Sequence, residues 1–368
     1  MQAANHTPMQ ALCKIAPTQG GIGLRQLDVP QPGPGQVRIR VAAAGICGTD
    51  MQIWNWAPRM ARRMHLPRVL GHEISGVIDA LGPGLEQHAG GKGASGGSPL
   101  QCGDHVSLES HVYCGHCRQC HTGRAHLCAS TSYPGIDFDG GFAEYVVVPA
   151  SIVWVNPPDL PHDIAAMLEP CGIAVHASLA GSGVAGQSVL INGCGPIGLM
   201  NVAAARALGA RRIIASDPNP LRRQCALQLG ADRAVNPMEE NLAAVVRDLT
   251  GSQESGGGVD VGIEYSGTEA GFQAVFDSLC KGGDFRLVGA PPSAIPVDFS
   301  YWLIKCPTLH TIHGRRIWDS WVQTTDLLQS GRMDIRPVAS HVLPLSEAAR
   351  GFELIRAGEA LKPILIPG

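Results

Sequence analysis

The sequence predicts an α/β protein with two domains, a β-rich one followed by one built on a doubly wound parallel sheet. The chain has 368 residues, more than a single compact core ordinarily holds. Its first 150 or so residues form short alternating segments broken by Gly and Pro, which is typical of β-structure. From about Glu169 onward, strand-like runs alternate with helix-like runs, which predicts a parallel sheet covered by helices.

Composition limits the classes of function. Hydrophobic residues make up 45% of the chain and charged residues 16%, enough apolar material for large cores. The 28 Lys and Arg residues against 31 Asp and Glu give a formal net charge of -3, which argues against a nucleic-acid partner. No apolar run approaches the roughly 20 residues that span a bilayer, and the N-terminal residues do not resemble a secretory signal. We therefore expect a cytoplasmic protein without a membrane partner.

The elements can be placed along the chain. In the first part, the strand-like segments are 35–47, 72–82 and 140–149, and the Gly-rich segment Gly90–Pro99 is expected to be a surface loop. In the second part, 188–217 contains a strand, a glycine turn, a helix and a second strand. Further helices are expected near 221–229, 241–250 and 270–279, with strands at 234–236, 259–265, 285–289 and 309–313. A helix near 318–330 and a strand at 338–343 follow and need not belong to that sheet.

Four cysteines lie close together in the sequence, with the spacing C-x2-C-x2-C-x7-C: Cys114, Cys117, Cys120 and Cys128. In a long chain without a secretory signal, such spacing favours a metal site over disulfides. Four thiolates suit a tetrahedral zinc ion, and an iron–sulfur cluster is the alternative. Because four thiolates fill the coordination sphere of zinc, such a site would be structural.

A glycine pattern follows the run Ser188–Asn192 and opens the next helix. The residues of this turn that we expect to contact a dinucleotide are Gly193, Gly195, Pro196, Ile197 and Gly198. Glycines permit a tight turn there, and the N–H groups of the helix face the pyrophosphate. Asp217 ends the next strand and can bind both ribose hydroxyls, which favours NAD over NADP; the nearby Arg222 and Arg223 weaken this preference.

Three short motifs supply further metal-ligand types. Cys47 lies in GICGTD, His72 and Glu73 lie in GHE, and Glu169 lies in MLEPCG. Each residue alone has a structural explanation, because single cysteines and histidines are common core residues. Together, a thiolate, an imidazole and carboxylates are the ligands of a catalytic zinc ion that keeps an open position.

These motifs occur in an order that resembles the medium-chain zinc-dependent alcohol and polyol dehydrogenases over nearly the whole chain. The segments GICGTD, GHE, the cysteine run, GGFAEYVVVP, LEPCGIAVHA and NGCGPIG carry the resemblance. Within that family the chain is most similar to the L-threonine 3-dehydrogenases, in SHVYCGHCRQCHTGRAHLC, VDVGIEYSG and HGRRIWDSW. The resemblance implies a GroES-like catalytic domain over 1–168, a Rossmann domain over 169–314, and a return of 315–368 to the catalytic domain.

The resemblance also implies a reaction and a set of roles. It implies a homotetramer with two zinc ions per subunit that oxidises a small polar secondary alcohol, threonine-like, with NAD; a polyol (sorbitol-like) or butanediol dehydrogenase and a non-catalytic relative are the alternatives. Cys47, His72 and Glu169 match catalytic zinc ligands, with Glu73 as an adjacent carboxylate that binds the zinc or moves on and off it. Thr49 matches the hydroxyl that begins the proton relay, and His111 resembles a substrate-side histidine. The four clustered cysteines match the structural zinc ligands.

One residue departs from the family pattern. Gln52 stands where family members usually carry a histidine that passes the proton towards solvent. Because an amide does not titrate, we expect the relay to end in water, the cofactor ribose or another group.

Overall fold

The structure is a computed structural model that describes residues 7–85, 99–251 and 257–368. The chain divides into two compact units, residues 1–169 with 339–368 and residues 170–338. It returns to the first unit at Ala339, later than the residue 315 expected from the sequence. The reason is that the 3-10 turn η4 (Arg336–Val338) still packs on α6 (Pro196–Ala207) and α7 (Pro220–Gln228) of the second unit. Except for Pro99, the expected loop Gly90–Pro99 lies outside the described residues.

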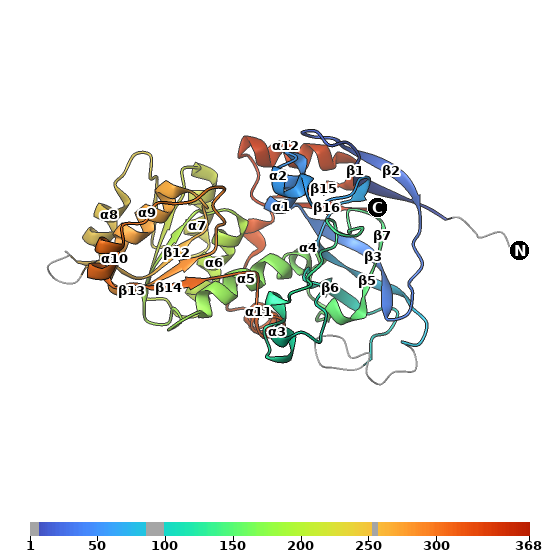
Figure 1. The fold of residues 1–368 in the computed structure, drawn as a ribbon, viewed down its shortest axis with the longest axis horizontal. Helices are drawn as coiled ribbons and strands as arrows, with labels where there is room; N and C mark the ends of the chain where they lie inside the picture. Colours follow the sequence, from blue (N-terminus) through green and yellow to red (C-terminus); the bar gives the residue numbers. More distant parts are fainter. Residues whose placement is uncertain (1–6, 86–98, 252–256) are drawn as a thin grey trace, which may run out of the picture. The chain divides into compact units, whose positions relative to one another are not determined.

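The first unit is built on β-sheets (Figure 1). In its described residues, the larger sheet has the order β15-β16-β3-β5-β6-β8, with β7 also paired to β3. These strands are β3 (Gln36–Gly45), β5 (Glu73–Leu81), β6 (His105–Leu108), β7 (Tyr145–Pro149), β8 (Val153–Val155), β15 (His341–Pro344) and β16 (Pro363–Ile366). A smaller sheet has the order β2-β1-β4, from β1 (Pro8–Lys14), β2 (Ile22–Asp28) and β4 (Arg68–Val69).

Short helices complete this unit, and they connect or cover the strands. They are α1 (Gly48–Trp54), α2 (Pro58–Ala61), α3 (Arg118–His121), α4 (His162–Ala166) and α12 (Ala348–Ala357), with the 3-10 turns η1 (Ala125–Leu127), η2 (Ala150–Ile152) and η5 (Leu345–Glu347). The alternation in β3 buries Val37, Ile39 and Val41 in the core. Towards its end β3 is buried on both faces, because it approaches the group of polar side chains described below.

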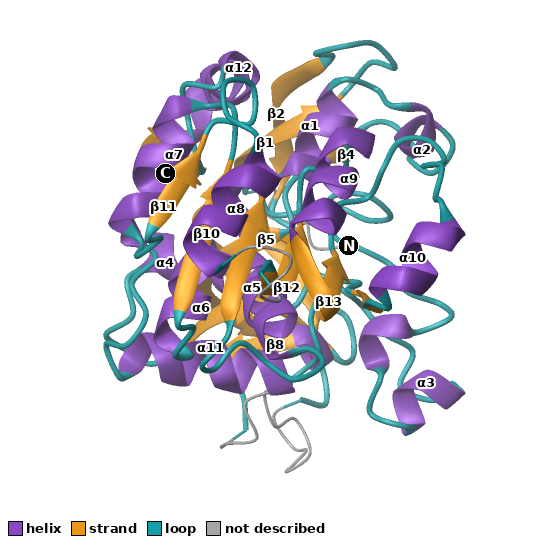
Figure 2. Cartoon of the chain, turned by 90° about the vertical axis from the view of Figure 1, so that its left-hand side faces the viewer, coloured by secondary structure: helices purple, strands orange, loops and turns teal. Residues whose placement is uncertain are grey.

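The second unit contains a parallel sheet covered by helices (Figure 2). Its strand order in the described residues is β11-β10-β9-β12-β13-β14, and all neighbouring strands are parallel. The strands are β9 (Ser188–Asn192), β10 (Arg212–Ser216), β11 (Arg233–Val235), β12 (Val259–Glu264), β13 (Leu279–Leu287) and β14 (Thr308–Thr311). Counted from β9, this is the 3-2-1-4-5-6 order of the Rossmann fold, so the predicted doubly wound sheet is confirmed.

Helices pack against this sheet in two groups. α6 packs on α7, and α8 (Leu242–Thr250) packs on α9 (Glu269–Ser278). The remaining helices are α5 (Leu168–Leu179), within which the chain passes from the first unit to the second, α10 (Phe299–Lys305) and α11 (Asp319–Gln329). Across the described residues, none of the helices has the combination of length and apolar character needed to cross a membrane.

Candidate metal centre and cofactor site

Strand register brings the three ligand types of the first unit together. β3 and β5 are antiparallel, and Gly45 at the end of β3 pairs with Glu73 at the start of β5. Cys47 follows this pair by two residues and His72 precedes it by one. As a result, ligand atoms of Cys47, His72 and Glu73 all lie within 4.8 Å of one another. Gly45 is required here, because a Cβ atom at this position would collide with Glu73 Oε2.

The electrostatics of this group fit a bound cation. Burial alone would lower the pKa of His72, but the negative charges of Cys47 and Asp50 raise it to about 10. His72 Nδ1 and Glu73 Oε1 are both buried without a hydrogen-bond partner. A thiolate, an imidazole and a carboxylate are zinc-type donors, and a divalent cation would satisfy these atoms.

Other predicted residues of this centre lie nearby on helices. Glu169 is the second residue of α5 and is buried; it is not among the three residues within 4.8 Å, but its charge contributes to raising the pKa of His72. Thr49 is half-buried in the first turn of α1. Asp50 Oδ2 accepts a hydrogen bond from the backbone N–H of Cys47 at 2.9 Å, which fixes the start of α1. Gln52 is exposed on the same helix.

Sequence reasoning missed Lys362, a fully buried cation beside this group. Its Nζ forms an ion pair with Glu73 Oε2. Burial lowers the pKa of Lys362, but the charges of Glu73 and Cys47 outweigh this and raise it. Removing one partner of such a pair would leave a buried charge uncompensated, at a cost of about 3–5 kcal/mol. A lysine in the run LKPILI carries no local signal of this role, since the contact depends on β16 pairing with β3.

His111 lies just beyond β6 and is also buried. Its ring Nδ1 and its backbone N–H both contact Glu109 Oε1, each at 2.8 Å. The edge of the ring faces Tyr133, with 5.0 Å between ring centroids. Glu109, which is completely buried, was not singled out from the sequence.

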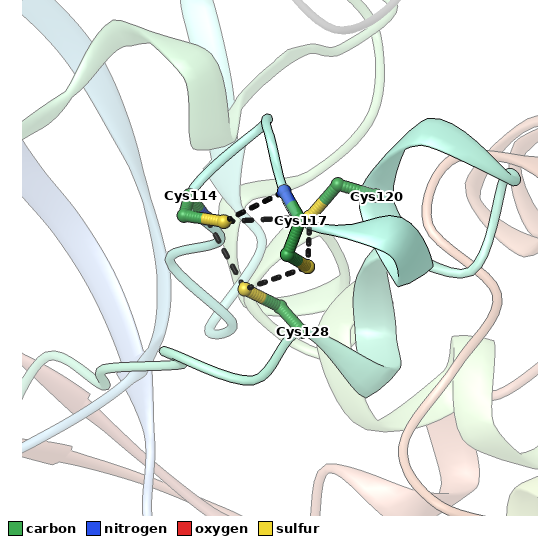
Figure 3. A group of neighbouring side chains, drawn as sticks. All are labelled: Cys114, Cys117, Cys120 and Cys128. Carbon is green, nitrogen blue, oxygen red and sulfur yellow. Dashed lines mark hydrogen bonds between the residues drawn. The ribbon is translucent and has the colours of Figure 1, made fainter.

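The four clustered cysteines converge as their spacing predicts (Figure 3). The Sγ–Sγ distances are 3.5 Å for Cys117–Cys120, 3.9 Å for Cys117–Cys128 and 4.0 Å for Cys114–Cys120. These distances are too long for disulfides. Backbone N–H groups of Ala129 and Cys120 donate to Cys117 Sγ and lower the pKa of this thiol to about 6. Burial and hydrogen bonding to the neighbouring thiol of Cys117 raise the pKa of Cys120 to about 12, so the convergence of the four sulfur atoms, rather than the pKa values, fits a closed tetrahedral metal site.

The glycine turn of the second unit joins β9 to α6, and its three glycines differ in what a side chain at each position would meet. Gly193 has φ 92°, and a Cβ there would lie 2.6 Å from the backbone nitrogen of Ser266. A Cβ on Gly198 would collide with the carbonyl oxygen of Gly193. Gly195 faces open space, with nothing within 4 Å of a Cβ. The turn therefore leaves room for a ligand at Gly195, which caps α6, and the helix begins at Pro196 as predicted.

Asp217 follows β10 directly and lies in a cavity of about 770 Å³ that is also lined by Gly193, Gly195 and Arg222. Asp217 Oδ2 accepts from the N–H of Cys194 at 2.8 Å. Arg222 Nη1 is 3.5 Å from the same oxygen, so the carboxylate and the guanidinium restrain each other.

Comparison with known proteins identifies the family. The alcohol dehydrogenase GroES-like domain matches residues 33–159, and the zinc-binding dehydrogenase domain matches residues 196–330. An L-threonine 3-dehydrogenase of Thermococcus kodakarensis is 40% identical over 361 residues, covering 98% of both chains. The chain belongs to the zinc-binding alcohol dehydrogenase family. It is therefore a zinc-dependent oxidoreductase that acts on a CH–OH group with a nicotinamide cofactor, as the sequence predicted.

Solved members of this family have the same fold. An Escherichia coli alcohol dehydrogenase complexed with NADH gives a TM-score of 0.85 at 26% identity, covering 98% of this chain and 99% of that one. The 2R,3R-butanediol dehydrogenase of Bacillus subtilis gives 0.84 at 26% identity, covering 98% and 100%. The predicted combination of a GroES-like domain and a Rossmann domain is confirmed.

Proposed function

We propose that the chain oxidises a threonine-like amino or hydroxy alcohol with NAD, using a zinc ion held by Cys47, His72 and Glu169, with Glu73 beside it. The observation that carries the proposal is the group of half-buried Cys47 with buried His72 and Glu73, which combines zinc-type donors with an excess of negative charge. The GHE and GICGTD motifs and the family membership support the assignment.

The residues around this group have distinct tasks. When bound, zinc acts as a Lewis acid that makes the proton of an alcohol easier to remove. Thr49, two residues after Cys47, accepts that proton and passes it on. Gln52 cannot accept it by titration, so water or the cofactor ribose receives it. Lys362 keeps Glu73 within the buried group by charge attraction, while leaving its Oε1 without a hydrogen-bond partner.

The cofactor and the second metal follow from separate observations. Asp217 places a negative charge in the cavity beside the glycine turn, which disfavours the 2′-phosphate of NADP and supports NAD. The four cysteines support a second, structural zinc ion, because four thiolates leave no open coordination position. The family resemblance further leads us to propose a cytoplasmic homotetramer.

The substrate class is proposed from the relatives. The 40% identity to an L-threonine 3-dehydrogenase over 98% of the chain favours a threonine-like substrate. The butanediol dehydrogenase, with 26% identity, keeps a diol as the second candidate.

A substrate panel tests the proposal. Purified full-length chain is assayed for NADH formation with threonine, 2,3-butanediol and sorbitol, before and after removal of metal by a chelator. We expect the highest kcat/KM with threonine or a related amino alcohol, complete loss of turnover without metal, and recovery on adding zinc. Turnover that persists in metal-free protein would overturn the zinc mechanism, and preference for butanediol or sorbitol would overturn the substrate class.

A further inference from the structure

Strand register places Glu109 and His111 beside the metal-binding segment of β5. The antiparallel β5–β6 ladder pairs Ser75 with Ser107. If this register is continued two residues further, Glu109 lies across from Glu73, and His111 follows by two residues. The chain is still hydrogen-bonded at this point, because the N–H of Glu109 donates to Ile152 O at 2.9 Å.

The same reasoning applies on the other side of β5. Gly45 pairs with Glu73 across β3 and β5, and Cys47 follows Gly45 by two residues. β5 is the central strand between β3 and β6. The ends of β3 and β6 therefore flank the start of β5, with Cys47 two residues after β3 and His111 three residues after β6. This arrangement supports a position of His111 on the side of β5 opposite to Cys47.

The contacts of Glu109 fix the proton position on the His111 ring. Glu109 Oε1 accepts from the backbone N–H of His111 at 2.8 Å, which identifies this oxygen as an acceptor. The same oxygen is 2.8 Å from ring Nδ1. Nδ1 must therefore carry a hydrogen, and in the neutral imidazole the other nitrogen, Nε2, is then an acceptor.

A second contact restrains the ring from its edge. The His111 and Tyr133 rings meet at 64°. Tyr133 is in turn covered by the guanidinium of Arg63, 4.8 Å from the ring centroid. Arg63 is held by Asp137, with Nε and Oδ1 2.8 Å apart. Arg63 therefore restrains the ring of Tyr133, and Tyr133 in turn restrains the imidazole ring of His111.

We propose that Glu109 is a positioning residue that holds His111 with Nδ1 protonated, so that Nε2 accepts a hydrogen bond from a donor group of the substrate. The inference rests on the proposed function, in which His111 faces the substrate. It deepens that function, because an acceptor at Nε2 selects alcohols that carry a neighbouring donor. The ammonium group of an amino alcohol is such a donor, as is the second hydroxyl of a diol.

The first test measures the tautomer directly. The zinc-loaded full-length chain is labelled with ¹⁵N-histidine, and the resonances of His111 are assigned by their loss in His111→Ala. We expect the neutral ring of the wild-type chain to show a protonated Nδ1 and an unprotonated Nε2. A wild-type ring protonated at Nε2 would overturn the proposal, whether or not any variant folds.

The second test asks whether Glu109 acts through His111. In Glu109→Gln the side chain keeps its shape, but the amide can donate a hydrogen bond as well as accept one. The variant therefore permits the His111 tautomer that is unprotonated at Nδ1. We expect kcat/KM for the best amino alcohol to fall about ten-fold or more. The same change in the His111→Ala background should alter kcat/KM less than about two-fold, because its target is already absent. Equal losses in both backgrounds would show a purely structural role for Glu109 and overturn the proposal.

A matched control and a substrate comparison complete the experiment. Asp79→Asn removes a carboxylate of β5 that pairs with Arg38 on the neighbouring strand, and it should leave kcat/KM unchanged. The wild-type chain should prefer an amino alcohol over the same alcohol without its amino group, and His111→Ala should lose this preference. Absence of alcohol turnover in the wild-type chain would refute the proposed function, while the tautomer measurement would still decide the role of Glu109.

Discussion

At the scale of single residues, Asp217 and Arg222 lie in the cavity beside the glycine turn, where we propose that the cofactor ribose binds. The Asp217 carboxylate accepts a hydrogen bond from the backbone N–H of Cys194 in the glycine turn. The guanidinium of Arg222 is 3.5 Å from Asp217 Oδ2. A negative charge in this position repels a 2′-phosphate, whereas a free arginine would attract it. We therefore expect the choice between NAD and NADP to depend on which of the two charges dominates.

We expect Asp217→Asn to reverse much of this preference. The substitution removes the negative charge, retains one acceptor oxygen and releases Arg222 to meet a phosphate. The ratio of kcat/KM for NAD to kcat/KM for NADP should fall by about ten-fold or more, measured by initial rates at a fixed alcohol concentration. Asp232→Asn, which breaks the ion pair with Arg206 elsewhere in the unit, is the control. An unchanged ratio in Asp217→Asn would remove this residue from cofactor selection.

At the scale of elements, the turn between β9 and α6 contains one glycine that the backbone conformation requires and another for which we expect a role in ligand binding. Gly193 is needed by the backbone itself, since its φ is 92° and a Cβ would approach Ser266. Gly195 has φ −63°, which any residue adopts, and its surroundings are open. We therefore expect the glycine at this position to serve the close approach of the cofactor.

Two alanine substitutions test this separation. Gly193→Ala should lower the free energy of unfolding by about 1–3 kcal/mol, because it combines backbone strain with a collision. Gly195→Ala should change stability by less than about 0.5 kcal/mol, yet it should weaken NAD binding by at least about ten-fold through contact with the pyrophosphate. Thermal unfolding and a fluorescence titration with NADH measure the two quantities. Wild-type affinity in Gly195→Ala would contradict a cofactor role for this turn.

Local patterns predicted some elements better than others. The parallel strands β9, β10 and β12 are short apolar runs next to a glycine turn or a helix, and their positions follow from the sequence. β13 begins at Leu279, earlier than the expected residue 285. The prediction missed the first half of this strand because Lys281 and Gly282 in it are exposed. Apolar periodicity cannot detect a strand segment whose side chains face solvent.

At the scale of the whole molecule, the two proposed zinc ions should differ in what their loss affects. Cys47→Ser and Cys117→Ser should each reduce the zinc content from two ions per chain to one. Cys47→Ser should abolish turnover but leave Tm nearly unchanged. Cys117→Ser should lower stability by at least about 2 kcal/mol, or roughly 4–8 °C in Tm, since a closed site contributes folding free energy.

Zinc analysis, calorimetry and NADH formation measure these effects on the same preparations. Cys102→Ser, which changes an exposed cysteine of the same unit, is the control. If both ligand variants lost stability to the same extent, the division into a catalytic and a structural ion would be wrong.

The candidate site was predictable only where its members lie in short motifs. Cys47, His72 and Glu73 stand in GICGTD and GHE, and the four cysteines have a recognisable spacing. Lys362 and Glu109 have no such signal. The Lys362–Glu73 contact arises from pairing between strands far apart in the chain, whereas the Glu109–His111 contact is local but is not marked by a known motif. A buried charge is recognisable only when its partner is known.

The position of Lys362 immediately before β16 has a consequence for the order in which the site assembles during synthesis. β16 pairs with Gly45 and Ala44 of β3, although about 320 residues separate the two strands in the sequence and β3 is synthesised first. A nascent chain already contains Cys47, His72 and Glu73, but not the lysine that compensates the glutamate. The cysteine loop, by contrast, is complete within residues 114–128. The proposed structural zinc site can thus assemble once residues 114–128 have been synthesised, whereas the Glu73–Lys362 pair requires a residue that is synthesised much later.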